Sequence, residues 1–234
     1  MNRAAMPTKT FLLWIGIILL AVLQACGGGG TRGTTLGGGS TDPNATPAAA
    51  SMQLLVGSPT VGSAGDTTVG LTAVVLDANN RALAGKRVTL RATDPSSSAF
   101  LSTFSSADDA TDANGLFTAR LNVGNNQANR TITVTATANS VSDTGGVSVI
   151  GTALTIAGST SLVTGASTPL TISLKDSAGN AMIGLPLTVS SSRGNTLSPA
   201  AGTTNQNGQL IVTVTGTSPG SDTITVSGSG TTAT

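Results

Sequence analysis

The chain has 234 residues, of which only 9% are charged, and it contains neither histidine nor tyrosine and a single cysteine. Without histidine, neither Ser-His-Asp nor Cys-His catalysis nor a histidine-ligated zinc site can be built. A net charge of +1 and an aromatic content of 2% exclude the basic stripe with stacking rings that a nucleic-acid binder uses. The abundant Thr, Val, Ser and Gly favour strands and turns over helices.

Residues 1–25 have the layout of a secretory signal. Arg3 and Lys9 supply a positive start, and residues 11–23 (FLLWIGIILLAVL) form an uncharged apolar run. A membrane-spanning helix needs about 20 apolar residues, so this run favours a cleaved signal over an anchor helix. An uncleaved helix stays open as the alternative.

The end of that run resembles the lipobox of bacterial lipoproteins, formed here by Leu23, Gln24, Ala25 and Cys26. The resemblance implies cleavage before Cys26, a diacylglyceryl group on its sulfur and acylation of its freed amine. Gln24 departs from the small or β-branched residue usual in that family. The alternatives are an exported protein with a free thiol and a buried structural cysteine. In lipoproteins an Asp directly after the cysteine retains the protein at the inner membrane. The residue here is Gly27, which implies an outer-membrane address.

Residues 26–51 are expected to form a tether behind the lipidated cysteine. Their Gly, Ser and Thr-rich sequence contains little that could build a core. About 25 such residues reach roughly 25 to 30 Å as a flexible chain. The glycine runs lack the Gly-Lys-Ser/Thr ending of a phosphate-binding loop.

From Met52 onward apolar residues alternate with polar ones, which predicts half-buried strands. The predicted strands of the first half lie around residues 69–75, 88–92, 117–123, 132–136 and 147–150, and those of the second half around 170–174, 187–189, 210–214 and 224–226. The fold class expected is all-β, with two tandem β-sandwiches over residues 52–150 and 151–234.

The two halves can be aligned with each other. Asp77 lies over Asp176 and Gly85 over Gly184 at an offset of 99 residues. Further on, Thr111 to Gly115 lies over Thr204 to Gly208, and Ile132 over Ile224. At that last offset the counterpart of Ile150 would fall near position 242, so the second copy is expected to lack its last strand. The favoured explanation is that the chain is the front portion of a longer reading frame. The alternative is that the terminal domain has an open edge with which a partner could pair.

The repeated motif is similar to the bacterial immunoglobulin-like (Ig-like) domains of the intimin and invasin group. The first copy carries it through Val75, Asp77, Gly85, Val88, Thr111, Asp112, Asn114, Gly115 and residues 132–136, and the second departs at Asn205 and Gly228. The resemblance implies Greek-key Ig-like sandwiches that serve as stalk segments of surface adhesins. In that group receptor binding resides in a terminal lectin-like domain, which has no match in this sequence.

The turns hold the candidate site residues. Asp108, Asp109 and Asp112 beside Asn114 could begin a calcium loop, but the second copy has no carboxylates at that turn. The favoured interpretation is structural, with positive φ at Asn114-Gly115 and Asn207-Gly208 and local backbone hydrogen bonds at Asp77 and Asp176. Gly85 and Gly184 belong to the same group of turn residues. No catalytic residue and no cofactor is predicted.

The sequence thus predicts a lipid-anchored, non-catalytic stalk of the cell envelope for adhesion or surface display. Its expected location is the surface of the outer membrane, with the periplasmic side as the alternative. The expected partners are the membrane, through the lipid, and a host or envelope protein or glycan, but no nucleic acid. The alternatives are an assembly lipoprotein that binds an envelope partner through a sheet edge and, less favoured, a polysaccharide-binding module, which would want exposed aromatic rings.

Overall fold

The computed structural model describes residues 47–103 and 109–234, and all of its regular structure in these ranges is β-strand. No helix suited to crossing a membrane occurs in these two ranges. The described residues do not include residues 1–25, Cys26, most of the tether expected at 26–51, or Asp108. The all-β prediction is confirmed.

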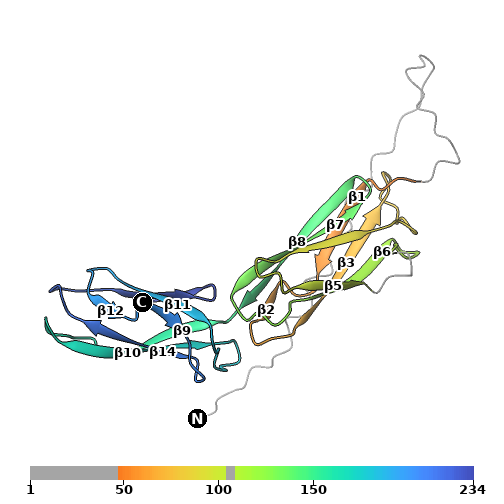
Figure 1. Ribbon diagram of the computed structural model, residues 1–234. Helices are drawn as coiled ribbons and strands as arrows, with labels where there is room; N and C mark the ends of the chain where they lie inside the picture. The colour runs from red at the N-terminus through yellow and green to blue at the C-terminus, as the bar shows by residue number, and fades with distance from the viewer. Residues whose placement is uncertain (1–46, 104–108) are drawn as a thin grey trace, which may run out of the picture. The chain divides into compact units, whose positions relative to one another are not determined.

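The first sandwich consists of two four-stranded sheets (Figure 1). One sheet has the order β1-β3-β6-β5 and contains β1 (Ser51–Val56), β3 (Thr68–Leu76), β6 (Leu116–Asn122) and β5 (Phe100–Thr103). The other has the order β2-β8-β7-β4 and contains β2 (Thr60–Gly62), β8 (Val141–Ile150), β7 (Arg130–Ala138) and β4 (Thr89–Thr93). The short β2 runs parallel to the end of β8, and the other pairs are antiparallel.

The second sandwich repeats this plan. One sheet has the order β12-β14-β10-β9 and contains β12 (Thr196–Ser198), β14 (Gln209–Thr215), β10 (Ser167–Lys175) and β9 (Ala153–Gly158). The other has the order β13-β11-β15-β16 and contains β13 (Ala201–Thr203), β11 (Pro186–Ser191), β15 (Ile224–Gly228) and β16 (Thr231–Ala233).

The strand order identifies the fold. When β1, β3, β4, β5, β6, β7 and β8 are lettered A to G, one sheet of the first sandwich reads A-B-E-D and the other contains C-F-G. This is the order of a constant-type Ig domain. In the second sandwich β9, β10, β14 and β12 take the A-B-E-D places, and β11, β15 and β16 the C-F-G places. The predicted pair of tandem Ig-like Greek-key sandwiches is therefore confirmed.

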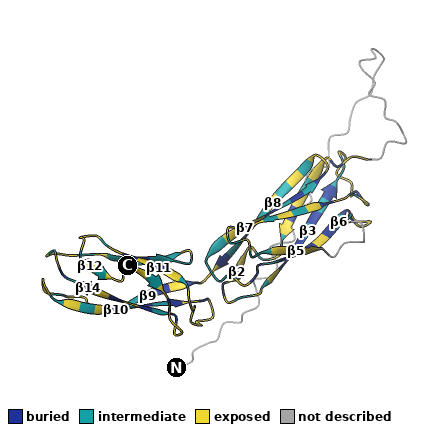
Figure 2. Ribbon diagram, viewed as in Figure 1, coloured by how far each residue is buried: buried dark blue, intermediate teal, exposed yellow. Residues whose placement is uncertain are grey.

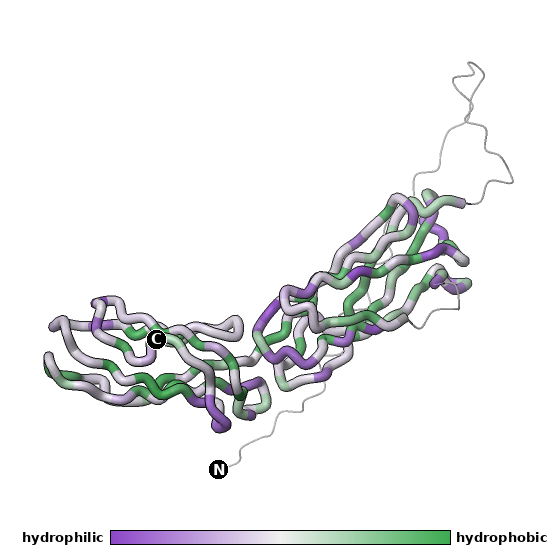
Figure 3. The backbone as a smooth tube through the Cα atoms, in the orientation of Figure 1, coloured by the Kyte–Doolittle hydropathy of each residue, from purple (hydrophilic) through white to green (hydrophobic). Residues whose placement is uncertain are grey.

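Side-chain alternation places one face of each predicted strand in the core. Val69, Leu71, Ala73 and Val75 along β3 are buried, and the residues between them are more exposed. Figure 2 shows this alternation along the long strands, and Figure 3 shows apolar stretches along the same strands. Leu170 is buried on β10 as expected, and Thr133 is exposed on β7. The predicted strand register is confirmed at these positions.

The first sandwich begins earlier than residue 52. The backbone N–H of Ala50 donates to the carbonyl of Leu76, and β1 starts at Ser51. Ala49 is already buried. The peripheral strands β1, β2, β5, β9, β12 and β13 had no counterpart in the sequence prediction. They are three to six residues long, and most show too little alternation for a period to be read.

The alignment of the last hairpins needs a correction of two residues. Leu90 of β4 pairs with Ala136, and its counterpart Val189 of β11 pairs with Val226. Val226 therefore takes the place of Ala136, and Ile224 takes that of Val134 rather than Ile132. The error arose because side chains in a strand repeat every two residues, so a slip of two keeps the same face buried.

In the second copy β16 takes the place of the last strand. β16 pairs with β15 through three residues, whereas the ten-residue β8 runs along the whole of β7.

Candidate functional site

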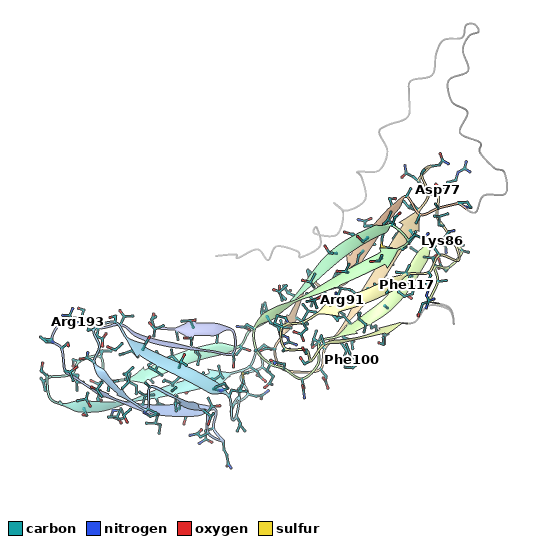
Figure 4. The ribbon with its side chains drawn as sticks, turned by 45° about the horizontal axis from the view of Figure 1, so that its top comes forward. Asp77, Lys86, Arg91, Phe100, Phe117 and Arg193 are labelled. Carbon is teal, nitrogen blue, oxygen red and sulfur yellow. The ribbon has the colours of Figure 1, made fainter. Side chains whose placement is uncertain are left out.

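Asp77 and Asp176 close equivalent turns after β3 and β10. One carboxylate oxygen of Asp77 accepts the backbone N–H groups of Asn79 and Arg81, at 2.7 and 2.9 Å. Asp176 does the same with the N–H groups two and four residues further on, both at 2.9 Å. Figure 4 shows Asp77 at one end of the first sandwich. Both side chains stabilise backbone turns.

Burial and hydrogen bonding act in opposite directions on Asp176. Burial alone would raise the pKa of its carboxyl group, but hydrogen bonds from the backbone and side chain of Asn180 and from the N–H groups of Ala178 and Gly179 outweigh it. The pKa of Asp176 therefore lies below its ordinary value, and the carboxylate stays charged at neutral pH.

The second pair of turns precedes β6 and β14. The Asp112 carboxylate accepts the N–H groups of Asn114 and Leu116 at 2.8 and 2.9 Å. In the other copy the amide oxygen of Asn205 accepts the N–H groups of Asn207 and Gln209 at 2.9 and 3.0 Å. An amide oxygen thus replaces a carboxylate in the same role.

In these two turns only the glycine has a positive φ angle. Gly115 has a φ of 71° and Gly208 a φ of 68°. The expectation that Asn114 and Asn207 share this conformation is wrong, since neither is among the described residues with positive φ. Each turn bonds the glycine N–H to the carbonyl three residues back, as in a type I turn followed by one left-handed residue, where only the last position needs glycine.

Gly85 and Gly184 lie in loops that a buried threonine holds in place. Both glycines have positive φ and donate their N–H groups to the carbonyls of Thr111 and Thr204 respectively. The Thr111 hydroxyl donates to the carbonyl of Leu83 and accepts the N–H of Lys86. The Thr204 hydroxyl does the same with Met182 and Leu185. These positions are structural in both copies.

The calcium candidates are only partly described. Asp112 is engaged in its turn, and the Asp109 carbonyl accepts the N–H of Val88. Asp108 lies outside the described residues. Within residues 47–103 and 109–234, no group of three or more acidic, histidine or cysteine side chains could hold a metal ion.

Asp94 and Arg130 form a buried ion pair that the sequence analysis missed. Arg130 Nε lies 2.9 Å from Asp94 Oδ1, and the two side chains are 5% and 2% exposed. The guanidinium group also donates to the carbonyls of Val123 and Ala128. The pair therefore fastens the loop after β4 to the start of β7. The run Asp-Pro-Ser-Ser-Ser from Asp94 onward was the available signal, because these residues favour hydrogen-bonded turns.

The pKa of Asp94 is held far below its ordinary value. Burial would raise it, but hydrogen bonds from the side chain and backbone of Ser96, the backbone N–H of Ala99 and the Arg130 guanidinium outweigh that effect. The carboxylate is therefore ionised at neutral pH and serves the fold.

Asp222 performs the same task in the second sandwich with uncharged partners. Its carboxylate accepts the hydroxyls of Ser191 and Ser192 at 2.7 and 2.9 Å and the Asn195 amide at 2.8 Å. Burial would raise its pKa, but these hydrogen bonds and the N–H of Arg193 lower it far below the ordinary value. Asp222 fastens the loop after β11 to the residues just before β15.

Among the described residues, the phenylalanines do not form a surface of exposed rings on which a sugar could stack. Phe117 is buried in the core, whereas Phe100 is 56% exposed at the start of β5. Both are labelled in Figure 4. Phe104 lies outside the described residues.

A groove of about 970 Å³ opens in the second sandwich. It is bounded by β9, β10, β14 and the first residue of β15, by the two loops at residues 159–164 and 216–223, and by Thr234. Its apolar lining consists of Ile156, Leu162, Leu170, Val214 and Ile224. Asp222 and Asn195 form part of its polar wall. The sequence analysis suggested an open edge here but no groove.

One family model matches the second sandwich. Residues 156–234 match the model of a bacterial Ig-like domain (group 1). The matched segment runs from within β9 to Thr234, whereas the sequence motif was better preserved in the first copy. No protein with a curated description matches the chain.

Several solved structures of bacterial surface proteins are similar to the chain. The Yersinia pseudotuberculosis adhesin InvE shares 19% identity over 78% of this chain, with a TM-score of 0.46. Invasin, a bacterial integrin-binding protein, shares 21% over 76%, with a TM-score of 0.39. The D0–D1 domain of intimin shares 21% over 74%, with a TM-score of 0.35. The chain spans 56% of the InvE structure and 36% of the invasin structure. The assignment of the fold rests on the strand order described above.

Proposed function

We propose that the protein is a lipid-anchored, non-catalytic stalk of the bacterial cell envelope that serves adhesion or surface display. The observation that carries the proposal is the tandem repetition of one Ig-like sandwich. The carboxylates of Asp77, Asp112 and Asp176 close turns in that repeated fold. The match of residues 156–234 to bacterial Ig-like domains supports the same class of function.

The lipid on Cys26 is the part of the proposal that sets its location. Cells that express the full chain are fed an alkyne-tagged fatty acid, and the protein should carry the tag and sediment with the outer membrane. Cys26→Ala should lose the tag and the membrane attachment. Gly27→Asp is the matched control, which should keep the tag but move to the inner membrane. A tagged Cys26→Ala protein would refute the anchor.

Surface display is tested separately from the lipid. Protease added to intact cells should degrade the two sandwiches if they face the medium. Protection in intact cells, with degradation after the outer membrane is permeabilised, would place the sandwiches on the periplasmic side and contradict display. A periplasmic protein of known location reports whether the cells stayed intact.

A further inference from the structure

Two turns of the chain contain an asparagine followed by a glycine. Asn114-Gly115 precedes β6, and Asn207-Gly208 precedes β14. Both asparagines are exposed, whereas both glycines are buried. An asparagine before a glycine is prone to lose its side-chain amide, because glycine has no side chain to shield its backbone nitrogen. The two turns therefore contain the groups for a spontaneous covalent reaction.

The reaction is deamidation through a succinimide ring. The glycine nitrogen attacks Cγ of the asparagine, a bond forms between these two atoms, and the bond from Cγ to Nδ2 breaks. Nδ2 leaves as ammonia and takes the proton that the glycine nitrogen loses. Water then opens the ring at either of its carbonyl carbons. The product is aspartate or isoaspartate, and in isoaspartate the backbone runs through the side-chain carbon.

In the folded chain the attacking nitrogen is occupied in both turns. The N–H of Gly115 donates to the carbonyl of Asp112 at 3.0 Å, and the N–H of Gly208 donates to the carbonyl of Asn205 at 2.9 Å. To react, the nitrogen must lose both this hydrogen bond and its proton. The closed turn therefore keeps the nucleophile away from the asparagine side chain.

The rest of each glycine is fixed against a central strand. The carbonyl of Gly115 accepts the N–H of Val75 on β3, and the carbonyl of Gly208 accepts the N–H of Leu174 on β10, both at 2.9 Å. A Cβ built on Gly115 would lie 2.8 Å from the Val75 oxygen, and one built on Gly208 would lie 2.7 Å from the Leu174 oxygen. Neither glycine can turn towards its asparagine without leaving that strand.

These contacts connect each turn to the core of its own sandwich. Val75 and Leu174 are both fully buried and belong to the apolar clusters of the first and the second sandwich respectively. Core strands open only together with the cooperative unit to which they belong. Ring closure at Asn114 therefore requires the first sandwich to open, and ring closure at Asn207 requires the second to open.

We propose that Asn114 and Asn207 are deamidation sites that the folded sandwiches keep closed and that unfolding exposes. Each turn then converts a transient unfolding of its own sandwich into a permanent covalent change. Isoaspartate adds a carbon to the backbone of the turn, so the side-chain oxygen of Asp112 or Asn205 is no longer placed to accept both of its backbone N–H groups. Chemical modification of the unfolded chain makes unfolding irreversible.

The first test compares the folded with the unfolded chain. The full chain is incubated at neutral pH in buffer and in urea, and peptide mass spectrometry follows the conversion of Asn114 and Asn207 to aspartate and isoaspartate. We expect both to convert at least about tenfold faster in urea. Synthetic peptides of residues 112–116 (DANGL) and 205–209 (NQNGQ) are the controls without a fold and should convert at the same rate in both solvents.

Two core variants assign each turn to its sandwich. Leu71→Ala removes a buried side chain of the first sandwich, so it should speed the conversion of Asn114 in buffer at least about tenfold and leave Asn207 unchanged. Leu170→Ala should have the reverse effect. Thr133→Ala is the matched control on the solvent face of β7 and should change neither rate. If a core variant does not fold, the unchanged chain in a series of urea concentrations decides the question.

Equal conversion rates in buffer, in urea and in the peptides would overturn the inference, because the fold would then give no protection. Conversion in buffer that neither core variant accelerates would also overturn it, because local opening of the turn would then expose the nitrogen. Peptides that do not convert would show that the two sequences are unreactive, with the same consequence. None of these outcomes affects fatty-acid labelling of Cys26, so the proposed function is tested separately.

Discussion

The two sandwiches share one strand order but differ in the number of buried apolar side chains in their cores. Among the described residues, nineteen buried apolar side chains form one cluster in the first sandwich and nine in the second. Val147 and Val149 of β8 and Val61 of β2 belong to the larger cluster. The same Ig-like strand order therefore forms around two cores of different size.

The sandwiches also differ in how they fasten the loop after the C strand. The first uses the Asp94–Arg130 ion pair, and the second surrounds Asp222 with hydroxyl and amide donors. A buried ion pair leaves an uncompensated charge when one partner is lost, while neutral donors leave only unmet hydrogen bonds.

The largest expected effect follows from that difference. Asp94→Ala leaves the buried Arg130 charge without its partner and should destabilise the first sandwich by about 3 to 5 kcal/mol. Asp222→Ala should cost the second sandwich about 1 to 3 kcal/mol, because its partners are uncharged. Hydrogen exchange of peptides from each sandwich, measured by mass spectrometry, gives the two losses separately. Equal losses of stability in the two sandwiches would contradict the distinction between the Asp94–Arg130 ion pair and the hydrogen-bonded Asp222.

Truncation of a buried leucine should have the next largest effect, and the loss of stability should differ between the two sandwiches. Leu71→Ala and Leu170→Ala should each destabilise their own sandwich, within the range of about 2 to 5 kcal/mol for buried leucine. Leu71 is 2% exposed, whereas Leu170 is 7% exposed and already borders the groove. We therefore expect the larger loss at Leu71, measured by urea unfolding. A larger loss at Leu170 would show that the groove is closed in solution.

Acid should weaken both sandwiches. The pKa values of Asp94, Asp176 and Asp222 are lowered in the folded chain. Groups with a lowered folded pKa stabilise the fold above their unfolded pKa of about 3.9, and this contribution disappears as the pH falls towards the folded values. Melting temperatures should thus decline below about pH 4. Asp222→Asn should flatten that decline in the second sandwich only, and an unchanged slope would argue against its role.

The smallest effect is expected on the solvent face. Thr133 is exposed on β7, so Thr133→Ala should change the free energy of unfolding by less than about 0.5 kcal/mol. Urea unfolding measures this change in the free energy of unfolding, with Leu71→Ala measured in parallel for comparison. A loss comparable with that of Leu71→Ala would invalidate the strand register.

The sequence predicted the central strands because their residues alternate between core and solvent over five or more positions, as along β3 and β14. It failed at the peripheral strands, which are too short for a period to be detected. It also placed Ile224 two residues out of register, since such a slip preserves alternation.

The candidate sites were predictable to the extent that their contacts are local. Asp77 and Asp112 bond residues two and four positions away, and turn chemistry anticipates such contacts. Asp94 and Arg130 are 36 residues apart, and Asp222 meets Ser191 from a distance of 31 residues. Nothing in a single sequence links such pairs before the sheets are paired.

The exchange of Asp112 for Asn205 changes the charge of a turn but not its hydrogen bonds. Each turn uses one side-chain oxygen as an acceptor of two backbone N–H groups, and the amide takes the place of the carboxylate. The turn therefore needs an oxygen acceptor at this position and does not need a negative charge. The same sandwich fold can thus carry one charge fewer on its surface with its turn intact.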